Sequence, residues 1–413
     1  MLSIYVFKDQ FLSSLKNIFS SIILNWFIAS IVLFAPISVF FGLVSPYIAK
    51  IKINSLKNSW KEIWNLYAIS TLWSIFWTFF AWFFLIPFFW TNNIILFISL
   101  IFIIVSIFLE FKTYKKSKII LIILIILLFI FQKYSNIYLN KNNIFVYDTT
   151  YSTAKVYDKI EYKWKNAKFL LINNEYSSAK YTDDNSNLLF EYTKYYDLVS
   201  YFNPNFQNAL MIWWAWYVYP TYFLEKFPLK KIDVVEIDSW LTHIAKKHFD
   251  LKENPNLKLI YEDWRTYLNK NKKKYDVIFW DAFKSYFSLP FNLTTLESYQ
   301  KMHDSLNDDW MVIINLISAF SWSKWDFFRA EYKTIKQIFP NILVFKTSNE
   351  KENLVQNIVV IGSKTKLDLT KKTDDENIKN LLIKVYKKEI IEDKPLLTDD
   401  FAPVDNYTLK AIN

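Results

Sequence analysis

Long stretches without charge dominate the first third of the chain. Residues 17–49 and 66–90 carry no charged side chain, and each is longer than the roughly 20 apolar residues that cross a bilayer. A third uncharged run, 91–109, is also long enough. A fourth, Ile119–Phe131, is short unless flanking lysines extend to the lipid interface. We therefore predict a membrane domain at residues 1–140 with about four transmembrane helices.

The N-terminal stretch mixes charged and apolar residues and lacks the basic start and apolar run of a cleavable leader, so we expect a multi-pass anchor retained in the cell membrane. Loops 50–65 and 112–118 each hold four lysines. The positive-inside rule places both loops in the cytoplasm, which with four spans puts both termini outside.

The pattern changes after Asn140. Residues 143–195 show short stretches of alternating apolar and polar residues, which predict a small antiparallel β unit at 141–200. From about residue 205, apolar strand-like runs alternate with helix-length stretches, as in βαβ units with a mainly parallel sheet. These runs are 209–212, 233–237, 257–261, 275–279, 311–317, 342–345 and 356–362.

The predicted fold class is therefore an α-helical transmembrane N-terminal part, a small antiparallel β unit, and an α/β Rossmann-like domain at 201–413.

Composition adds one anomaly. Among 413 residues there are only two glycines, Gly42 and Gly362, where about 29 are expected, and there are 17 tryptophans. Trp164 lies between two strand patterns, Trp310 comes just before a strand, and Trp322 lies in a polar loop. Turns of this kind usually need glycine.

We hypothesise that the gene reads the UGA codon as glycine, and that translating UGA as tryptophan produced the printed sequence. The alternative is a natural protein with indoles at its turns.

The metal-binding residue types are scarce. The chain has no cysteine, which excludes disulfides and thiolate chemistry. The three histidines, His243, His248 and His303, do not have the spacing of a zinc site. We interpret them as surface or helix-side residues and predict no metal.

The candidate chemistry follows the first four strands of the α/β domain. The first strand runs into Trp213, Trp214, Ala215 and Trp216, with a helix expected from about Val218. With glycine at the tryptophan positions, this turn lets the backbone approach a nucleoside at the N-terminus of a helix.

Acidic residues follow the next three strands in order. Glu236 ends the second strand, about twenty residues after the turn, where a carboxylate can bind both ribose hydroxyls. Asp263 follows the third strand and could accept from an adenine amino group. Asp281 follows the fourth. Each residue alone is weak support for a nucleoside site, because carboxylates at strand ends often cap helices. Their occurrence in order after successive strands is stronger support.

From about residue 143 to 405 the chain resembles the spermidine synthase (polyamine aminopropyltransferase) family, and with its spans it resembles the membrane-fused members. The resemblance rests on FEYTKYYDL, IWWAWYVYP, VVEID, YEDWRTYL, YDVIFWDAF and LTDDFAPVD, together with the span sequence of residues 66–90. Most of these stretches match better with glycine in place of tryptophan.

The resemblance implies a transferase of polyamine biosynthesis whose donor is decarboxylated S-adenosylmethionine. It makes residues 201–413 a catalytic domain of the Rossmann-like methyltransferase type that binds this S-adenosyl nucleoside. An enzyme with such a donor should face the cytosol, so the loop charges conflict with a cytoplasmic catalytic domain.

The resemblance places Glu236 on the ribose, Asp263 with Trp264 on the adenine, and Asp281 as the catalytic carboxylate that takes the proton of the attacking amine. The resemblance also exposes two departures. Ala215 and Lys284 stand where polyamine-specific members carry aspartates. We therefore expect a small amine acceptor that need not be putrescine.

Two other functions stay open. A methyltransferase using S-adenosylmethionine would share the loop and both acidic positions, and a non-catalytic ligand-sensing membrane protein would explain the missing acceptor aspartates. The net charge of +10 is carried partly by loops that membrane topology explains, so we predict lipid but no nucleic acid as a partner. The oligomeric state, a homodimer included, stays open.

Overall fold

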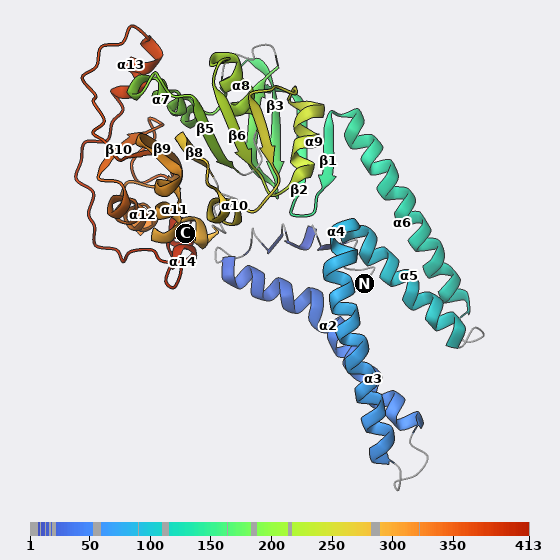
Figure 1. The fold of residues 1–413 in the computed structure, drawn as a ribbon. Coiled ribbons are helices and arrows are strands. Elements are labelled where there is room, and N and C mark those ends of the chain that lie inside the picture. Colours follow the sequence, from blue (N-terminus) through green and yellow to red (C-terminus); the bar gives the residue numbers. More distant parts are fainter. Residues whose placement is uncertain are drawn as a thin grey trace. The chain divides into compact units, whose positions relative to one another are not determined.

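The computed structural model describes residues 22–52, 59–89, 91–109, 115–162, 164–182, 188–213, 217–281, 290–321 and 323–412, with a few single positions before residue 22. The chain forms two compact units, Met1–Leu139 and Asn140–Asn413 (Figure 1). Each unit is described by itself. The small β unit and the α/β domain both fall within the second unit.

The first unit is helical. Its described elements are α2 (Ile22–Lys52), α3 (Ser59–Phe80), the π-helical η2 (Ala81–Leu85), α4 (Ile86–Phe88), α5 (Thr91–Leu109) and α6 (Lys115–Lys141), the last of which ends in the second unit. Three helical stretches within the described residues are long and apolar enough to cross a membrane, judged by length and composition: Ile23–Ile51, Trp60–Phe88 and Lys116–Lys141. The helix at Asn93–Phe108 is apolar but shorter.

Four spans were predicted. Three of the predicted runs overlap these stretches, and the span at residues 91–109 stays a prediction. The run Ile119–Phe131 is the centre of the longer helix α6, since no proline or glycine interrupts the chain between Lys115 and Lys141. The run 91–109 forms α5, whose 19 residues are close to the roughly 20 that cross a bilayer.

The second unit begins with a four-stranded antiparallel sheet in the order β1-β2-β3-β4. The strands are β1 (Ile144–Asp148), β2 (Thr153–Tyr162), β3 (Lys165–Ile172) and β4 (Glu175–Tyr181). Asn173 and Asn174 both have positive φ and form the two-residue turn between β3 and β4. Trp164, in the turn before β3, has φ of 66° and is 92% exposed. Glycine adopts that backbone conformation most readily.

A seven-stranded sheet follows, in the order β10-β11-β9-β8-β5-β6-β7. Its strands are β5 (Asn208–Trp213), β6 (Lys231–Val235), β7 (Leu257–Ile260), β8 (Tyr275–Asp281), β9 (Leu306–Ser318), β10 (Asn341–Lys346) and β11 (Gln356–Ser363). Strands β5 to β9 pair in parallel, and β11 is antiparallel to both of its neighbours. The seven apolar runs of the sequence thus form the seven strands of one α/β sheet, as predicted.

Helices cover both faces of this sheet. Two elements come before its first strand, η3 (Glu191–Asp197) and α7 (Leu198–Phe202). The elements between and after its strands are α8 (Val218–Lys226), α9 (Ser239–His248), α10 (Trp264–Lys270), η4 (Phe291–Leu293), α11 (Leu296–Ser305), η5 (Ser323–Trp325), α12 (Asp326–Ile338), α13 (Glu376–Leu382) and α14 (Val404–Ile412). Buried side chains of α7, α8 and α9 form one core, and those of α10, α11 and α12 form the other. Successive strand residues point to opposite faces, so the apolar strands supply both cores.

One tryptophan lies differently from its prediction. Trp310 was expected just before a strand, but β9 already begins at Leu306. The pairing of β8 with β9 shifts from Tyr275 opposite Leu306 to Val277 opposite Met311, which leaves residues 307–310 as a bulge. Trp322 lies outside the described residues.

His248 is buried at the end of α9, so of the two alternatives for the histidines it is a helix-side residue and not a surface one. Its Nε2 lies 2.7 Å from the hydroxyl of Tyr147 in β1, and its ring packs on Phe145. Burial, with a smaller contribution from the charge of Lys247, lowers the pKa of the imidazole to about 4. The residue therefore joins α9 to the small sheet as a neutral side chain.

Candidate functional site

The order in which the chain adds strands to the sheet reverses between β5 and β8, and we call this place the switch point. From β5 the chain moves outward through β6 and β7, then crosses back to place β8 on the other side of β5. In open α/β sheets, ligands bind at the carboxyl ends of the strands beside such a point. Trp213, the last residue of β5, pairs in register with Asp281, the last residue of β8. The two candidate positions therefore flank the switch point.

The other acidic candidates lie at the same edge. Glu236 directly follows β6, and Asp263 lies three residues after β7, just before α10. Parallel pairing brings these strand ends to one side of the sheet. Trp214, Ala215, Trp216 and Lys284 were also singled out from the sequence, and all four lie outside the described residues.

Asp281 is buried and held by hydrogen bonds on both oxygens. The amide of Asn315, in the neighbouring strand β9, donates to Oδ1 at 3.0 Å. The hydroxyl of Tyr196, in η3, lies 3.3 Å from Oδ2 and donates to it. Tyr192, one turn earlier, also donates to this carboxylate. The carboxyl group is therefore fixed in orientation by three polar side chains from two separate parts of the chain.

Burial dominates the electrostatics of Asp281. It raises the pKa of the carboxyl to about 7, and the hydrogen bonds from Asn315, Tyr192 and Tyr196 limit that rise. Burial and the nearby Asp281 charge likewise raise the pKa of the Tyr196 hydroxyl, which therefore stays protonated. A carboxyl group with a pKa near 7 can exchange a proton at neutral pH, as a general base must.

A layer of aromatic rings keeps water away from this carboxyl. The Tyr196 ring packs edge-on against Tyr219, with 5.0 Å between ring centres, and lies tilted against Phe279 of β8 at 5.2 Å. All three rings are almost fully buried. The low polarity of this layer explains why the pKa of Asp281 rises in spite of its hydrogen bonds.

The sequence analysis assigned no role to Tyr192, Tyr196 or Asn315. Both tyrosines belong to the stretch FEYTKYYDL, which was noted only for its resemblance. Asn315 interrupts the apolar run of β9 and is 1% exposed. A polar residue inside a buried strand needs a partner, and this could have indicated its role.

Glu236 is 3% exposed, and its Oε1 accepts a hydrogen bond from the backbone N–H of Asp238 at 2.8 Å. Asp238 is itself the N-cap of α9, where its side chain accepts from the N–H of Trp240. This arrangement fixes the Glu236 carboxylate beside the start of a helix. It suits the binding of vicinal hydroxyl groups.

Asp263 is the N-cap of α10. Its Oδ1 accepts from the backbone N–H and the hydroxyl of Thr266 at 2.9 and 3.1 Å. Asp263 is therefore a helix-capping carboxylate, the alternative noted for acidic residues at strand ends. The hydrogen bonds to Thr266 fix its side chain. The indole of the next residue, Trp264, lies 5.5 Å from the ring of Trp280 between centres. With glycine at either position, this ring contact would be lost.

No group of three or more His, Cys, Asp or Glu side chains that could hold a metal ion occurs within the described ranges.

Part of the second unit matches a known protein family. Residues 221–368 match the family model described as the spermine/spermidine synthase domain. The matched region begins within α8, ends shortly after β11, and includes Glu236, Asp263, Asp281 and Asn315.

Two relatives carry aminopropyltransferase names. The chain is 29% identical over 157 residues to the polyamine aminopropyltransferase of Vibrio vulnificus (strain CMCP6), covering 37% of this chain and 50% of that protein. It is 27% identical over 137 residues to the probable polyamine aminopropyl transferase of Bifidobacterium longum (strain NCC 2705), covering 33% of this chain and 30% of that protein. The chain thus spans half or less of these relatives' length.

Solved structures of similar proteins include a probable spermidine synthase from Corynebacterium glutamicum ATCC 13032. It is 20% identical, with a TM-score of 0.49, and the match covers 57% of this chain and 84% of that one. The spermidine synthase from Thermotoga maritima is 18% identical, with a TM-score of 0.45, over 62% and 82% of the two chains.

Proposed function

We propose that this chain is a membrane-anchored, spermidine-synthase-like aminopropyltransferase. It transfers the aminopropyl group of decarboxylated S-adenosylmethionine to a small amine. The observation that carries the proposal is the buried Asp281 carboxyl at the switch point of the sheet, held by Tyr196 and Asn315 with a pKa of about 7. The match of residues 221–368 to the spermine/spermidine synthase domain supports the same activity.

The chemistry is an in-line displacement. The nitrogen lone pair of the acceptor amine attacks the propyl carbon bound to the sulfonium, and a carbon–nitrogen bond forms as the carbon–sulfur bond breaks. The bonding electrons pass to sulfur, and neutral methylthioadenosine leaves. Asp281 takes the proton that the amine must lose, and Tyr196 and Asn315 keep its carboxylate in place. Orientation of the two substrates supplies the remaining acceleration.

Donor binding falls to the residues at the neighbouring strand ends. Glu236 accepts from the ribose hydroxyls, and Asp263 with Trp264 lies toward the adenine. The turn of residues 213–216 approaches the nucleoside, which requires glycine at its tryptophan positions. We propose that the acceptor is a small amine that need not be putrescine, because Ala215 and Lys284 stand where polyamine-specific members carry carboxylates that would bind a second cationic group.

We propose that the catalytic domain is cytoplasmic, because its nucleotide-like donor is a cytosolic substrate. The positive-inside rule places the lysine-rich segment 50–65 in the cytoplasm. Three spans, without residues 91–109, would put the catalytic domain on that same side, whereas four spans would put it on the other side.

An activity assay tests the proposal. The full-length protein, made with glycine at its tryptophan positions and purified in detergent, is incubated with decarboxylated S-adenosylmethionine and a panel of mono-, di- and polyamines. We expect release of methylthioadenosine that depends on the amine. Amine-dependent release of S-adenosylhomocysteine from S-adenosylmethionine would instead support a methyltransferase. No product from either donor would favour the sensor.

A further inference from the structure

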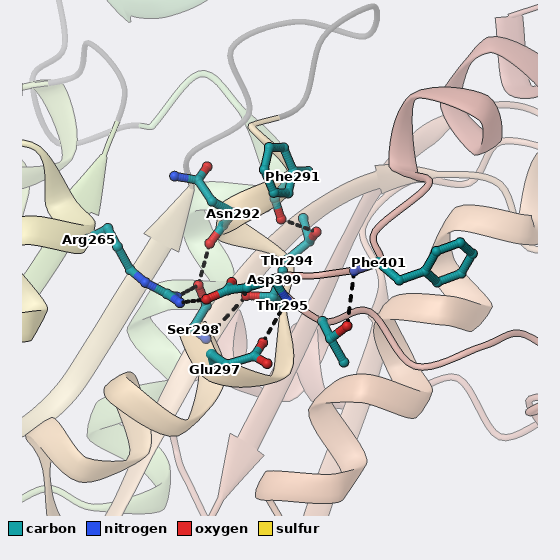
Figure 2. A network of polar contacts seen from close by, with 10 residues as sticks. Arg265, Phe291, Asn292, Thr294, Thr295, Glu297, Ser298, Asp399 and Phe401 are labelled. Carbon is teal, nitrogen blue, oxygen red and sulfur yellow. Dashed lines mark hydrogen bonds and ion pairs between the residues drawn. The ribbon is translucent and has the colours of Figure 1, made fainter.

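The C-terminal stretch LTDDFAPVD contains a polar junction that the proposed chemistry leaves unexplained. Figure 2 shows Arg265 of α10 and Asp399 of this stretch pointing toward one another. We define the Arg265 junction as Arg265, Thr295, Glu297, Ser298 and Asp399. All five residues belong to the second unit.

A single carboxylate joins two helices in this junction. Oδ2 of Asp399 forms an ion pair with the Arg265 guanidinium, near the start of α10. Oδ1 accepts from the hydroxyl of Thr295, the N-cap of α11, at 2.6 Å. The second guanidinium nitrogen of Arg265 donates to Ser298, in the first turn of α11. The fork of one arginine thus contacts both the carboxylate and the second helix.

The turn that carries Asp399 is itself held firmly. Thr398 and Phe401 exchange backbone hydrogen bonds of 2.9 and 3.0 Å, which close the turn. The backbone N–H of Asp399 donates to Glu297 at 2.9 Å. Before the turn, Leu397 is fully buried and its carbonyl accepts from the N–H of Leu296. Asp399 is therefore presented to Arg265 from a fixed backbone, although its side chain is 42% exposed.

The Arg265 junction lies close in the sequence to the acidic residues of the candidate site. Arg265 is two residues after Asp263, and both lie in the connection that leaves β7. Thr295 and Ser298 begin α11, the first long helix after Asp281. The junction therefore links the two connections that leave β7 and β8 at the ligand-binding edge. A shift of either helix start would move Asp263 relative to Asp281.

We propose that Arg265 and Asp399 are positioning residues for donor binding. They hold the first turn of α10 against α11, so that Asp263 meets the adenine of a donor whose propyl carbon lies beside Asp281. This inference rests on the proposed function. It gives the LTDD turn of the C-terminal segment the role of supporting the donor-binding site.

The test compares Asp399→Asn with Asp400→Asn in the full-length glycine-bearing protein. Both variants remove one negative charge from the same exposed turn, but only Asp399 contacts Arg265. The probe is decarboxylated S-adenosylmethionine. Calorimetry measures its Kd, and the activity assay measures its KM and the kcat. The melting temperature of each variant is recorded as well.

We expect Asp399→Asn to raise the Kd and KM for the donor about tenfold, with kcat nearly unchanged, and Asp400→Asn to match the unsubstituted protein. Arg265→Lys, which cannot reach both partners in the same way, should fall between them. The double variant Arg265→Asp/Asp399→Arg, which restores the pair with its charges exchanged, should recover most of the donor affinity.

Two results would overturn the inference in distinguishable ways. If Asp399→Asn lowers the melting temperature but leaves donor Kd and KM unchanged, the junction is structural only and the proposed function still stands. If the unsubstituted protein binds no donor, the proposed function fails and the inference fails with it.

Discussion

The hydroxyl of Tyr196 donates a hydrogen bond to Oδ2 of Asp281 at 3.3 Å, although 85 positions separate the two residues in the sequence. Both side chains are buried, and the aromatic layer around Tyr196 holds the carboxyl in a place of low polarity. The contact joins the segment before the sheet to the fourth strand of its parallel part. It helps to fix the orientation of the Asp281 carboxylate.

Loss of the Asp281 carboxylate should abolish proton transfer. We expect Asp281→Asn to lower kcat at least about 100-fold, because a positioned general base contributes that much or more. Tyr196→Phe should lower kcat less, since Asn315 still orients the carboxylate. The measurement is steady-state release of methylthioadenosine.

Asp276→Asn provides the matched control for this substitution. Asp276 is also buried in β8, but at the opposite end of the strand, where it accepts from the backbone N–H groups of Gln207 and Asn208. This variant should lose stability yet retain kcat in the folded fraction. Equal kcat values for Asp281→Asn and the unsubstituted protein would remove Asp281 from the mechanism.

The raised pKa of Asp281 predicts the pH dependence of the reaction. Only the ionised carboxylate accepts a proton, so activity is lost as the pH falls through the folded-state pKa of about 7. A plot of log kcat/KM against pH should bend near pH 7, in addition to the ionisation of the acceptor amine at higher pH. An inflection near pH 4 would mean that burial does not control this group.

Asn315→Leu should move that inflection to higher pH. The substitution removes the hydrogen bond to Oδ1, which favours the charged form of Asp281, so the pKa of the carboxyl should rise further. The comparison uses the same pH series for both proteins. An unchanged inflection would show that Asn315 does not contribute to the charge state of Asp281.

Glu236 should control donor affinity rather than the chemical step. Glu236→Gln keeps the size of the side chain but replaces charged hydrogen bonds to the ribose with neutral ones, so we expect the donor Kd to rise about 10- to 100-fold. Calorimetry with decarboxylated S-adenosylmethionine measures this. Glu225→Gln, an exposed substitution on α8, is the control. Equal affinities of the two variants would argue against a ribose contact.

The identity of the tryptophans is open to direct measurement. Trp164 has positive φ and is almost fully exposed, which suits glycine, whereas Trp280 is 2% exposed and stacks on Tyr299. We predict that mass spectrometry of the native protein finds glycine at Trp213 and Trp214 in the tryptic peptide 195–226. A peptide with both indoles intact would exclude the codon hypothesis for this turn.

Periodicity was sufficient to predict all seven strands of the large sheet, because each is an apolar run bounded by polar residues. It also indicated Glu236, Asp263 and Asp281, since the carboxyl end of a parallel strand is a position that the sequence can mark. Their proximity to a nucleoside remains a prediction.

Contacts between distant segments could not be predicted from the sequence pattern. Tyr196 is one of 27 tyrosines, and no neighbouring residue indicates that it contacts Asp281. His248 occupies a helix end, where an exposed position is usual, and its burial depends on Tyr147 of the small sheet. The length of α6 was underestimated because its polar last turns are helical without being apolar.

The central claim is that the second unit binds the decarboxylated donor through a glycine turn and the acidic residues of the strand ends. The most direct measurement is a calorimetric titration of the full-length glycine-bearing protein with decarboxylated S-adenosylmethionine and with S-adenosylmethionine, beside the same chain with tryptophan at positions 213, 214 and 216. We predict tighter binding of the decarboxylated donor, and its loss when the three indoles fill the turn. Tighter binding of S-adenosylmethionine, or no binding of either donor, would contradict the account.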